Sequence, residues 1–400
     1  MTEKTIHVVA PFHSRLVREK WSHCALTQIV IKQIRIFRAL GWRVIDYANF
    51  GSESEAHEHV ELLGREEFLN HFLDDGRPAQ GNAVIGSPGW TAWWNKLEPQ
   101  ISSRASGLGD HIVAHTFGDA ASGLVKTLPG CLHLETHIGY DRPGFGARRV
   151  FVSEAWRNFL FGKYGSDAGD HRWSWTVLPY YDREDWPFVE RAKTSDPYVA
   201  FLGRMTLSKG LSTIVEIARK MPDLEFRMAG SGMQRTEFYE KWNPPRNLVF
   251  IGEMAGHERA RYLGSASAVI VPTDYLEPCA GVVCEAALCG TPAVASSWGG
   301  FLETVERGKT GYLASTLAEW ISGIKAAFQL DRRRVHENAI ARFSLEVAAT
   351  QYGEILERLL SLKKRGWYTM PGEEDLPEGS TGGARNITHD PPPAGVQLLL

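Results

Sequence analysis

The sequence has few cysteines, and they form no pattern that would bind a metal. Cysteine occurs five times in 400 residues, and no two cysteines are spaced as Cys-x-x-Cys. Such pairs mark zinc and redox sites, while an even number of cysteines is typical of secreted disulfide frameworks. We therefore expect reduced, mostly packed thiols and a cytoplasmic protein.

Long hydrophobic runs are absent as well. No stretch of 18 apolar residues occurs, which argues against a membrane-spanning helix. The first ten residues, MTEKTIHVVA, lack the charged-then-apolar layout of a signal peptide. Peripheral membrane contact stays open, because Lys32, Arg35 and Arg38 on one amphipathic helix could meet a lipid head group. An ordinary solvated helix face is the favoured alternative.

Charge of one sign is not in excess. The chain has 44 Lys and Arg against 47 Asp and Glu, a net charge of −3, and its pI is near 6.5. This balance excludes a global attraction to nucleic acid or to anionic membranes. The composition, 43% hydrophobic and 23% charged, is that of a globular protein, and the length allows two domains.

Apolar stretches alternate with amphipathic ones in both halves of the chain, which predicts doubly wound parallel α/β sheets. Expected strands are 5–10, 42–47, 110–116, 132–137, 149–153, 198–203, 226–229, 248–252 and 268–271. Expected helices are 22–40, 89–104, 211–220, 317–329 and 344–364. Beyond residue 366 the chain is rich in Pro, Gly and acidic residues, a composition that cannot bury a core.

The most informative stretch is 271–296, VPTDYLEPCAGVVCEAALCGTPAVAS. Its pattern predicts a strand, a loop with Glu277, a helix opened by Gly281 that carries Glu285, and a further strand. A helix that begins at the carboxyl end of a strand points N–H groups and its positive dipole end into a crevice, which suits a phosphate. Glu285 should then contact something uncharged, such as a sugar hydroxyl. Alternatively, it only complements the helix dipole.

Two cations, Arg204 and Lys209, follow the strand that ends at Gly203. Cations at the carboxyl end of a strand can hold both phosphates of a nucleoside diphosphate, Arg through its planar fork and Lys as a point charge. Gly230 and Gly232 follow the next strand, and glycines there allow the backbone to approach a ligand. Each signal is weak alone, because surface cations are usually solvated.

Together these segments resemble the donor site of the family 4 glycosyltransferases, which are retaining enzymes of the GT-B fold. The match is strong over 198–313 and loose before it. It rests on two glutamates with seven residues between them, on Gly-Arg and Lys-Gly after the first strand of the second half, and on the segments GGFLETV and GKTGYL. The resemblance implies two Rossmann-like domains that face a central cleft. The implied parts are 1–190 for the acceptor, 191–345 for the donor, 346–366 for a helix that crosses back, and 367–400 for a flexible tail.

The resemblance also implies a role for each matching residue. Glu277 would hold hydroxyls of the donor sugar, and His115 would contact the same sugar from the opposite domain. Arg204 and Lys209 would stabilise charge on the leaving diphosphate, and these four residues are the predicted catalytic set. The predicted donor contacts are Gly203, Arg204, Lys209, Gly230, Gly232, Glu253, Met254, Ala280, Gly281, Val282 and Glu285, of which Glu253 and Met254 would pair with the base.

The implied reaction moves a hexose-type sugar from UDP or GDP to an acceptor. It would need no cofactor and no obligatory metal, and no Asp-x-Asp occurs in the chain. Residues 53–59 hold glutamates and histidines, and the pairs His111/His115 and His133/His137 share strand faces, so a metal site is conceivable. Solvated loops and ordinary strand ends are favoured. The tryptophans at 90, 93 and 94 favour packing over a stacking platform.

The sequence departs from the family pattern at several places. Ala280 stands where a glycine is usual, which puts a methyl group where donor sugars lie. Tyr180 and Tyr181 replace an Asn-Gly pair. Residues 23–27 and 47–53 resemble a branch of these transferases from phages and environmental sequences. The acceptor stays open, and a glycan, a lipid, a protein or a modified DNA base are candidates.

Two other functions fit the same residues. One is a sugar-phosphate synthase or phosphorylase on the same fold, for which Arg15, Arg18 and Lys20 in the first loop could bind the phosphate. The other is a catalytically silent protein that binds a nucleotide sugar. The intact Arg204, Lys209, Glu277 and Glu285 argue against the silent protein.

Overall fold

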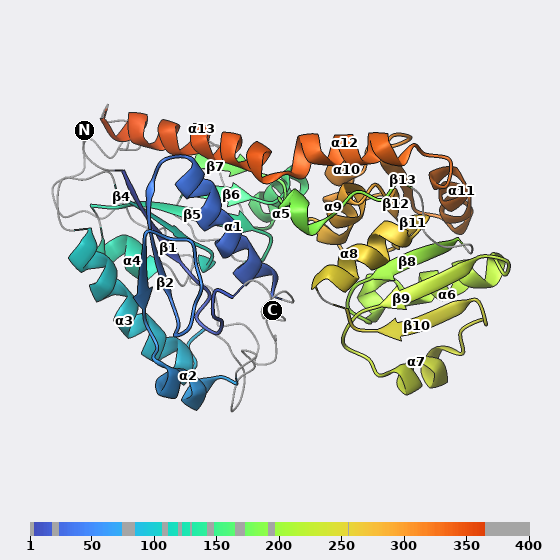
Figure 1. Ribbon diagram of the computed structural model, residues 1–400, viewed down its shortest axis with the longest axis horizontal. Coiled ribbons are helices and arrows are strands. Elements are labelled where there is room, and N and C mark those ends of the chain that lie inside the picture. The colour runs from blue at the N-terminus through green and yellow to red at the C-terminus, as the bar shows by residue number, and fades with distance from the viewer. Residues whose placement is uncertain are drawn as a thin grey trace.

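The computed structural model describes residues 4–17, 24–73, 85–105, 111–118, 122–128, 130–141, 148–164, 173–190, 197–254 and 256–364. The predicted tail, together with Arg18, Lys20 and His23, lies outside these residues. Figure 1 shows two α/β domains side by side, with α12 (Arg332–Phe343) above the second domain and α13 (Leu345–Lys364) above the first. The fold is GT-B, two Rossmann-like domains each built on a parallel sheet.

The first domain contains a seven-stranded parallel sheet with the order β3-β2-β1-β4-β5-β6-β7. Its strands are β1 (Thr5–Val9), β2 (Arg43–Ala48), β3 (Glu58–Glu61), β4 (His111–His115), β5 (Leu132–Ile138), β6 (Arg148–Phe151) and β7 (Ser174–Thr176). The strand order reverses between β1 and β4, so the crevice of this domain opens at their carboxyl ends. His115 is the last residue of β4.

Helices cover both faces of the first sheet. On one face α1 (Ala25–Ala39) and α13 pack together, with the rings of Phe37 and Tyr352 in edge contact. On the other face lie α2 (Arg65–His71), α3 (Pro88–Arg104) and α4 (Ser122–Thr127). Trp90 and Trp93 of α3 are buried in this second core, which confirms that the tryptophan cluster is packing. Helix α5 (Glu154–Tyr164) follows β6 at the junction with the second domain.

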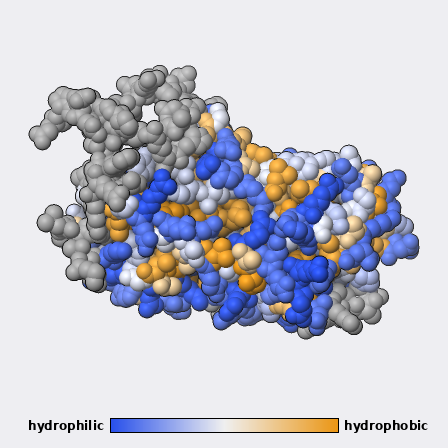
Figure 2. All heavy atoms as spheres, turned by 90° about the horizontal axis from the view of Figure 1, so that it is seen from above, coloured by the Kyte–Doolittle hydropathy of each residue, from blue (hydrophilic) through white to orange (hydrophobic). Residues whose placement is uncertain are grey.

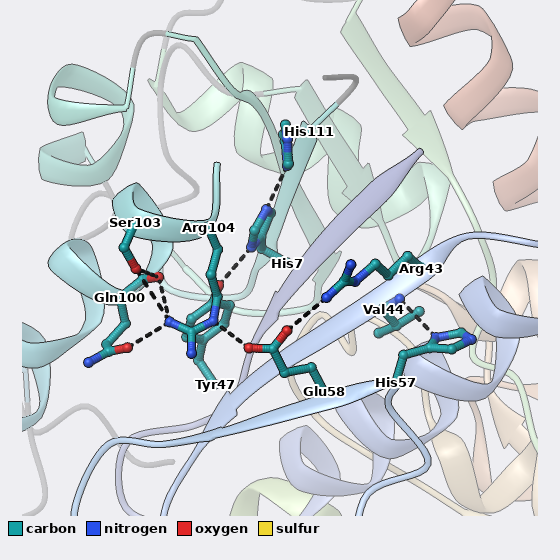
Figure 3. A network of polar contacts seen from close by, with 10 residues as sticks. All are labelled: His7, Arg43, Val44, Tyr47, His57, Glu58, Gln100, Ser103, Arg104 and His111. Atoms are coloured by element: carbon teal, nitrogen blue, oxygen red, sulfur yellow. Dashed lines mark hydrogen bonds and ion pairs between the residues drawn. The ribbon is translucent and has the colours of Figure 1, made fainter. Parts of the chain in front are cut away.

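The face under α3 also carries a layer of polar side chains, which Figure 3 shows from close by. His7 of β1 is hydrogen-bonded through Nδ1 to the Tyr47 hydroxyl at 2.8 Å and through Nε2 to His111 at 3.0 Å. Arg104 of α3 donates to Glu58 at 2.6 Å. Burial lowers the pKa of His7 to about 3, so this imidazole is neutral inside the fold.

The second domain contains a six-stranded parallel sheet with the order β10-β9-β8-β11-β12-β13. Its strands are β8 (Tyr198–Leu202), β9 (Glu225–Ala229), β10 (Leu248–Gly252), β11 (Ala268–Val271), β12 (Ala293–Ser296) and β13 (Gly311–Ala314). The helices are α6 (Leu211–Lys220), α7 (Arg235–Trp242), α8 (Gly256–Ser265), α9 (Gly281–Leu288), α10 (Phe301–Thr304) and α11 (Leu317–Ala327). The order reverses between β8 and β11, which places a second crevice at their carboxyl ends.

The two domains are joined where the chain crosses between them twice. The Tyr181 N–H donates to the Phe343 carbonyl at 2.8 Å, and the Leu345 N–H donates to the Tyr181 carbonyl at 3.1 Å. The crossing segments thus pair like two short strands, although they are far apart in sequence. Closely paired backbones limit the ways in which the domains can turn about this connection.

The basic face of α1 is occupied by contacts within the chain. Lys32 donates to the Tyr180 carbonyl at 2.7 Å. Arg35 and Arg38 both lie near Glu55, at 3.3 and 3.8 Å. These cations therefore have partners within the chain, and contact of this helix with a lipid head group stays a prediction.

No helix among the described residues is long and apolar enough to cross a membrane. Figure 2 shows the face seen from above, on which hydrophobic residues are interspersed with hydrophilic ones rather than gathered into one band.

Candidate functional site

The predicted donor residues lie around the carboxyl ends of β8, β9 and β11. The Gly203 N–H donates to the Ala229 carbonyl at 3.1 Å, and the Met205 N–H to the Ser231 carbonyl at 2.7 Å. A Cβ on Gly230, whose φ is +147°, would lie 1.7 Å from the Gly203 carbonyl oxygen. Only glycine fits at that position. The two backbones therefore meet tightly beside the crevice.

Lys209 is brought against the loop that follows β11. A Cβ on Gly210, with φ +80°, would lie 1.9 Å from the Pro272 carbonyl oxygen, so a glycine after Lys209 allows the close approach. The Lys209 ammonium then reaches the Glu277 carboxylate at 2.6 Å and lies 4.8 Å from the Tyr275 ring centroid. Two residues predicted to face the donor are thus in direct contact.

Arg204 is exposed on the same side. Burial raises the pKa of the Tyr275 hydroxyl, Glu277 raises it further, and the nearby Arg204 guanidinium partly opposes the rise. Lys209 thus lies next to the Tyr275 ring, and Arg204 is near enough to influence the pKa of the same hydroxyl. A dianionic diphosphate near this loop would meet both cations.

Helix α9 begins beside this cationic pair. Its N-cap residue Ala280 makes no side-chain hydrogen bond to the first turn, so that turn has no side-chain cap of its own. The Ala280 side chain is 6% exposed and packs in an apolar cluster with Val271 and Val283. Its methyl group is buried rather than exposed to open solvent. The loop that Lys209 contacts leads into the positive end of a helix dipole, an arrangement that suits an anionic ligand.

Glu285 differs from the expectation of an uncharged contact. Its carboxylate accepts a hydrogen bond from Arg259 of α8 at 2.6 Å, and the residue is 7% exposed. A Cβ on Gly281 would lie 2.7 Å from the Tyr181 hydroxyl and 3.7 Å from Glu285 Oε1, so Tyr181 lies next to the same helix turn. Sequence reasoning missed Arg259, because no motif spacing marks it, and it noted Tyr181 only as a departure.

Two further predicted residues follow β10. Gly252 has φ +100°, a conformation that turns the chain after this strand. Glu253 is exposed, while Met254 packs partly against the apolar cluster that contains Ala280. These residues lie on the same edge of the sheet as the cations.

In the first domain the His115 side chain is buried and uncharged. It is 1% exposed, and neither ring nitrogen has a hydrogen-bond partner within the described part of the chain. Burial lowers its pKa to about 3. A neutral imidazole with free nitrogens can donate or accept one hydrogen bond to a sugar hydroxyl. His137, next to the last residue of β5, is partly buried and has the positive φ of 53°.

Two histidines of the stretch 53–59, which was considered for a metal site, have hydrogen-bond partners within the chain. His59 contacts Asp46 at 2.9 Å, and His57 accepts from the Val44 N–H at 3.1 Å. Within the described ranges, no group of three or more His, Cys, Asp or Glu residues is arranged to hold a metal ion.

Known protein families and curated relatives are similar to the part of the chain that contains this site. A family model described as "Glycosyl transferases group 1" matches residues 182–342. Glycogen synthase from Thermus thermophilus is 30% identical over 182 residues, 43% of this chain and 41% of the relative. Alpha-maltose-1-phosphate synthase from Mycolicibacterium smegmatis is 28% identical over 189 residues, 42% of this chain and 48% of the relative. The chain thus aligns with less than half the length of these curated relatives.

Solved structures match nearly the whole chain. A sucrose-phosphate synthase from Thermosynechococcus elongatus superposes with a TM-score of 0.66 at 17% identity, covering 90% of this chain and all of that one. The Anabaena protein HepE, crystallised with UDP and glucose, superposes with a TM-score of 0.61 at 14% identity, covering 89% of this chain and all of that one. These likenesses establish the shared fold. Residues 182–342, which include the sheet of the second domain, match the model of the group 1 glycosyl transferases.

Proposed function

We propose that the protein is a retaining glycosyltransferase that moves a hexose-type sugar from a nucleoside diphosphate to an acceptor. The observation that carries the proposal is the contact of Lys209 with Glu277, in the loop that leads into α9, with Arg204 near Tyr275 of the same loop. The match of residues 182–342 to group 1 glycosyl transferases supports it. UDP and GDP are the favoured nucleotides.

The chemistry follows from charge that develops on the leaving group. As the bond between the anomeric carbon and the diphosphate oxygen breaks, negative charge grows on the phosphate. The two cations and the α9 N–H groups would stabilise that charge, each contact contributing on the order of 2 to 4 kcal/mol to lowering the barrier. The site supplies this charge from the protein alone, so the proposed reaction needs no obligatory metal.

Retention requires the acceptor to approach from the face that the leaving group occupies. The acceptor oxygen then bonds to the anomeric carbon, and its proton passes to the departing phosphate oxygen. Glu277, fixed by Lys209 at 2.6 Å, would hold hydroxyls of the donor sugar. His115 would hold the same sugar from the first domain, and Glu285 would contact the ribose. Gly203, Gly230, Gly232, Glu253, Met254, Gly281 and Val282 would complete the pocket.

A panel of UDP, GDP, ADP and TDP sugars tests the proposal through nucleotide release, with and without acceptors. Release from one donor above the buffer rate is expected, and product NMR would show whether the anomeric configuration is kept. If the nucleotide binds and no sugar is released with any acceptor, the silent binding protein is the better description.

A second candidate is a synthase that glycosylates a sugar phosphate. Two relatives are named as synthases of maltose 1-phosphate and sucrose phosphate. In this chain the buried Arg15 guanidinium lies 4.8 Å from the Phe50 ring at the carboxyl edge of the first sheet. Faster nucleotide release with sugar phosphates than with the matching free sugars would favour this candidate.

A further inference from the structure

Helix α5 of the first domain is capped by the second domain. The Glu303 carboxylate accepts hydrogen bonds from the N–H groups of Glu154 at 2.9 Å and Ala155 at 2.8 Å. The next N–H, of Trp156, donates to the Ser153 hydroxyl at 3.1 Å. The first turn of α5 therefore has its orphan N–H groups satisfied, and two of them depend on a residue of α10. Figure 1 shows α5 at the junction of the two domains.

A second contact lies beside the first. The Ser153 hydroxyl donates to the Pro278 carbonyl at 2.5 Å, directly after Glu277. The Glu277 carbonyl accepts from the Gly300 N–H at 2.8 Å. A Cβ on Gly300 would lie 2.3 Å from the Pro278 carbonyl oxygen. The donor loop and the start of α10 are thus packed without spare room, and both touch the start of α5.

These contacts exist only while the domains stay in this arrangement. A carboxylate at a helix N-terminus gains from two charge-assisted hydrogen bonds and from the helix dipole. A movement that separates the two domains at α5 would break the contacts of Glu303 with α5 and of Ser153 with Pro278 together and expose these groups to water. Glu319 offers a comparison, because it accepts from Ser315 and Thr316 at 2.8 and 3.0 Å within one domain. Its contacts do not change when domains move.

We propose that Glu303 and Ser153 form an interdomain clasp that holds the cleft closed and positions the Glu277 loop against the first domain. Both are positioning residues, since they act through the loop rather than on the reacting atoms. The catalytic consequence rests on the proposed function, whereas the effect on domain arrangement does not. The clasp also links α5 to the Lys209–Glu277 pair through a continuous set of contacts.

Domain arrangement gives the direct test. Spin labels on non-natural residues at the exposed positions Asn70 of α2 and Glu240 of α7 would report the distance between the domains without using native cysteines. Glu303→Ala is expected to broaden and lengthen the distance distribution. Glu303→Gln, which keeps one acceptor oxygen but no charge, should give an intermediate result. Glu319→Gln is the matched control and should leave the distribution unchanged, although both glutamates cap a helix.

Kinetics separate positioning from binding. With the donor that the nucleotide-release panel selects, Glu303→Ala should lower kcat at least fivefold. The Kd of UDP measured by calorimetry should stay within twofold, because the phosphate contacts lie in the second domain. Ser153→Ala should lower kcat by a smaller factor, and Ser153→Thr should restore it.

An unchanged distance distribution in both Glu303 variants would overturn the clasp. If Glu303→Ala does not fold, the distance distribution of Glu303→Gln tests the clasp instead. If no donor is turned over by the unsubstituted protein, the proposed function fails while the distance measurement still decides the clasp. A fall in kcat matched by an equal loss of UDP affinity, with unchanged distances, would make Glu303 a residue of the donor site instead.

Discussion

The two domains share one architecture but place their polar groups differently. In the second domain the charged groups of the predicted site lie at the carboxyl ends of β8 and β11, and the core is apolar. In the first domain, histidines and other polar side chains lie inside the sheet face under α3 (Figure 3). The difference is one of placement: the second domain gathers the charged groups of the predicted site at strand ends, whereas the first domain has ionisable side chains between its sheet and α3.

The largest predicted difference between the domains is in their stability at low pH, which should fall mainly in the first domain. Burial lowers the pKa of His7, His115 and His137 to about 3, and all three lie in the first domain. Below pH 6.5 these histidines are protonated in the unfolded chain but stay neutral in the folded domain. The free energy of unfolding therefore decreases as the pH falls from about 7 toward 3. At pH 5.5 the three histidines together are expected to lower the free energy of unfolding by an amount on the order of a few kcal/mol.

Hydrogen exchange followed by mass spectrometry, corrected for the intrinsic pH dependence, checks this expectation. Peptides of the first domain should lose protection between pH 7.5 and 5.5, while those of the second domain keep it. The variant His7→Gln removes one titrating group and should flatten the dependence of unfolding free energy on pH. Equal loss of protection in both domains would contradict the assignment of acid sensitivity to the first.

The features that the sequence could predict are those that depend on local patterns. Most strands and the longer helices were expected within a few residues, because buried strands and amphipathic helices have distinct periods. Sequence patterns did not predict the strands β3, β7 and β13 or the helices α2, α4, α7, α8 and α12. Lys209 and Glu277 were predicted to face one site because they follow strand ends at fixed spacings, and the structure brings them into contact. The Arg259–Glu285 ion pair and the contact of Glu303 with α5 join residues 26 and about 148 positions apart. Such pairings depend on how elements pack and domains meet, and no local pattern encodes them.

The next largest predicted effect is the loss of activity when Lys209, one of the two cations of the second domain, is removed. Lys209→Ala removes a charge next to the predicted diphosphate and leaves the 8% exposed Glu277 without its partner. We expect kcat/KM for the donor to fall about 10²-fold. Lys325→Ala, which removes an exposed lysine on α11, is the matched control. Activity of Lys209→Ala within threefold of the unsubstituted protein would remove this lysine from the site.

The smallest expected effect separates two roles of Glu285. Its carboxylate is predicted to bind ribose, yet it also pairs with Arg259. Glu285→Ala should lose at least tenfold in donor affinity or turnover, equivalent to about 1.4 kcal/mol. Arg259→Ala breaks the same ion pair but keeps the carboxylate, so it should lose less. Steady-state kinetics and calorimetric nucleotide binding on both variants separate the two roles. Equal losses would mean that Glu285 acts mainly by stabilising the second domain. A larger loss for Glu285→Ala would mean that its carboxylate binds the donor.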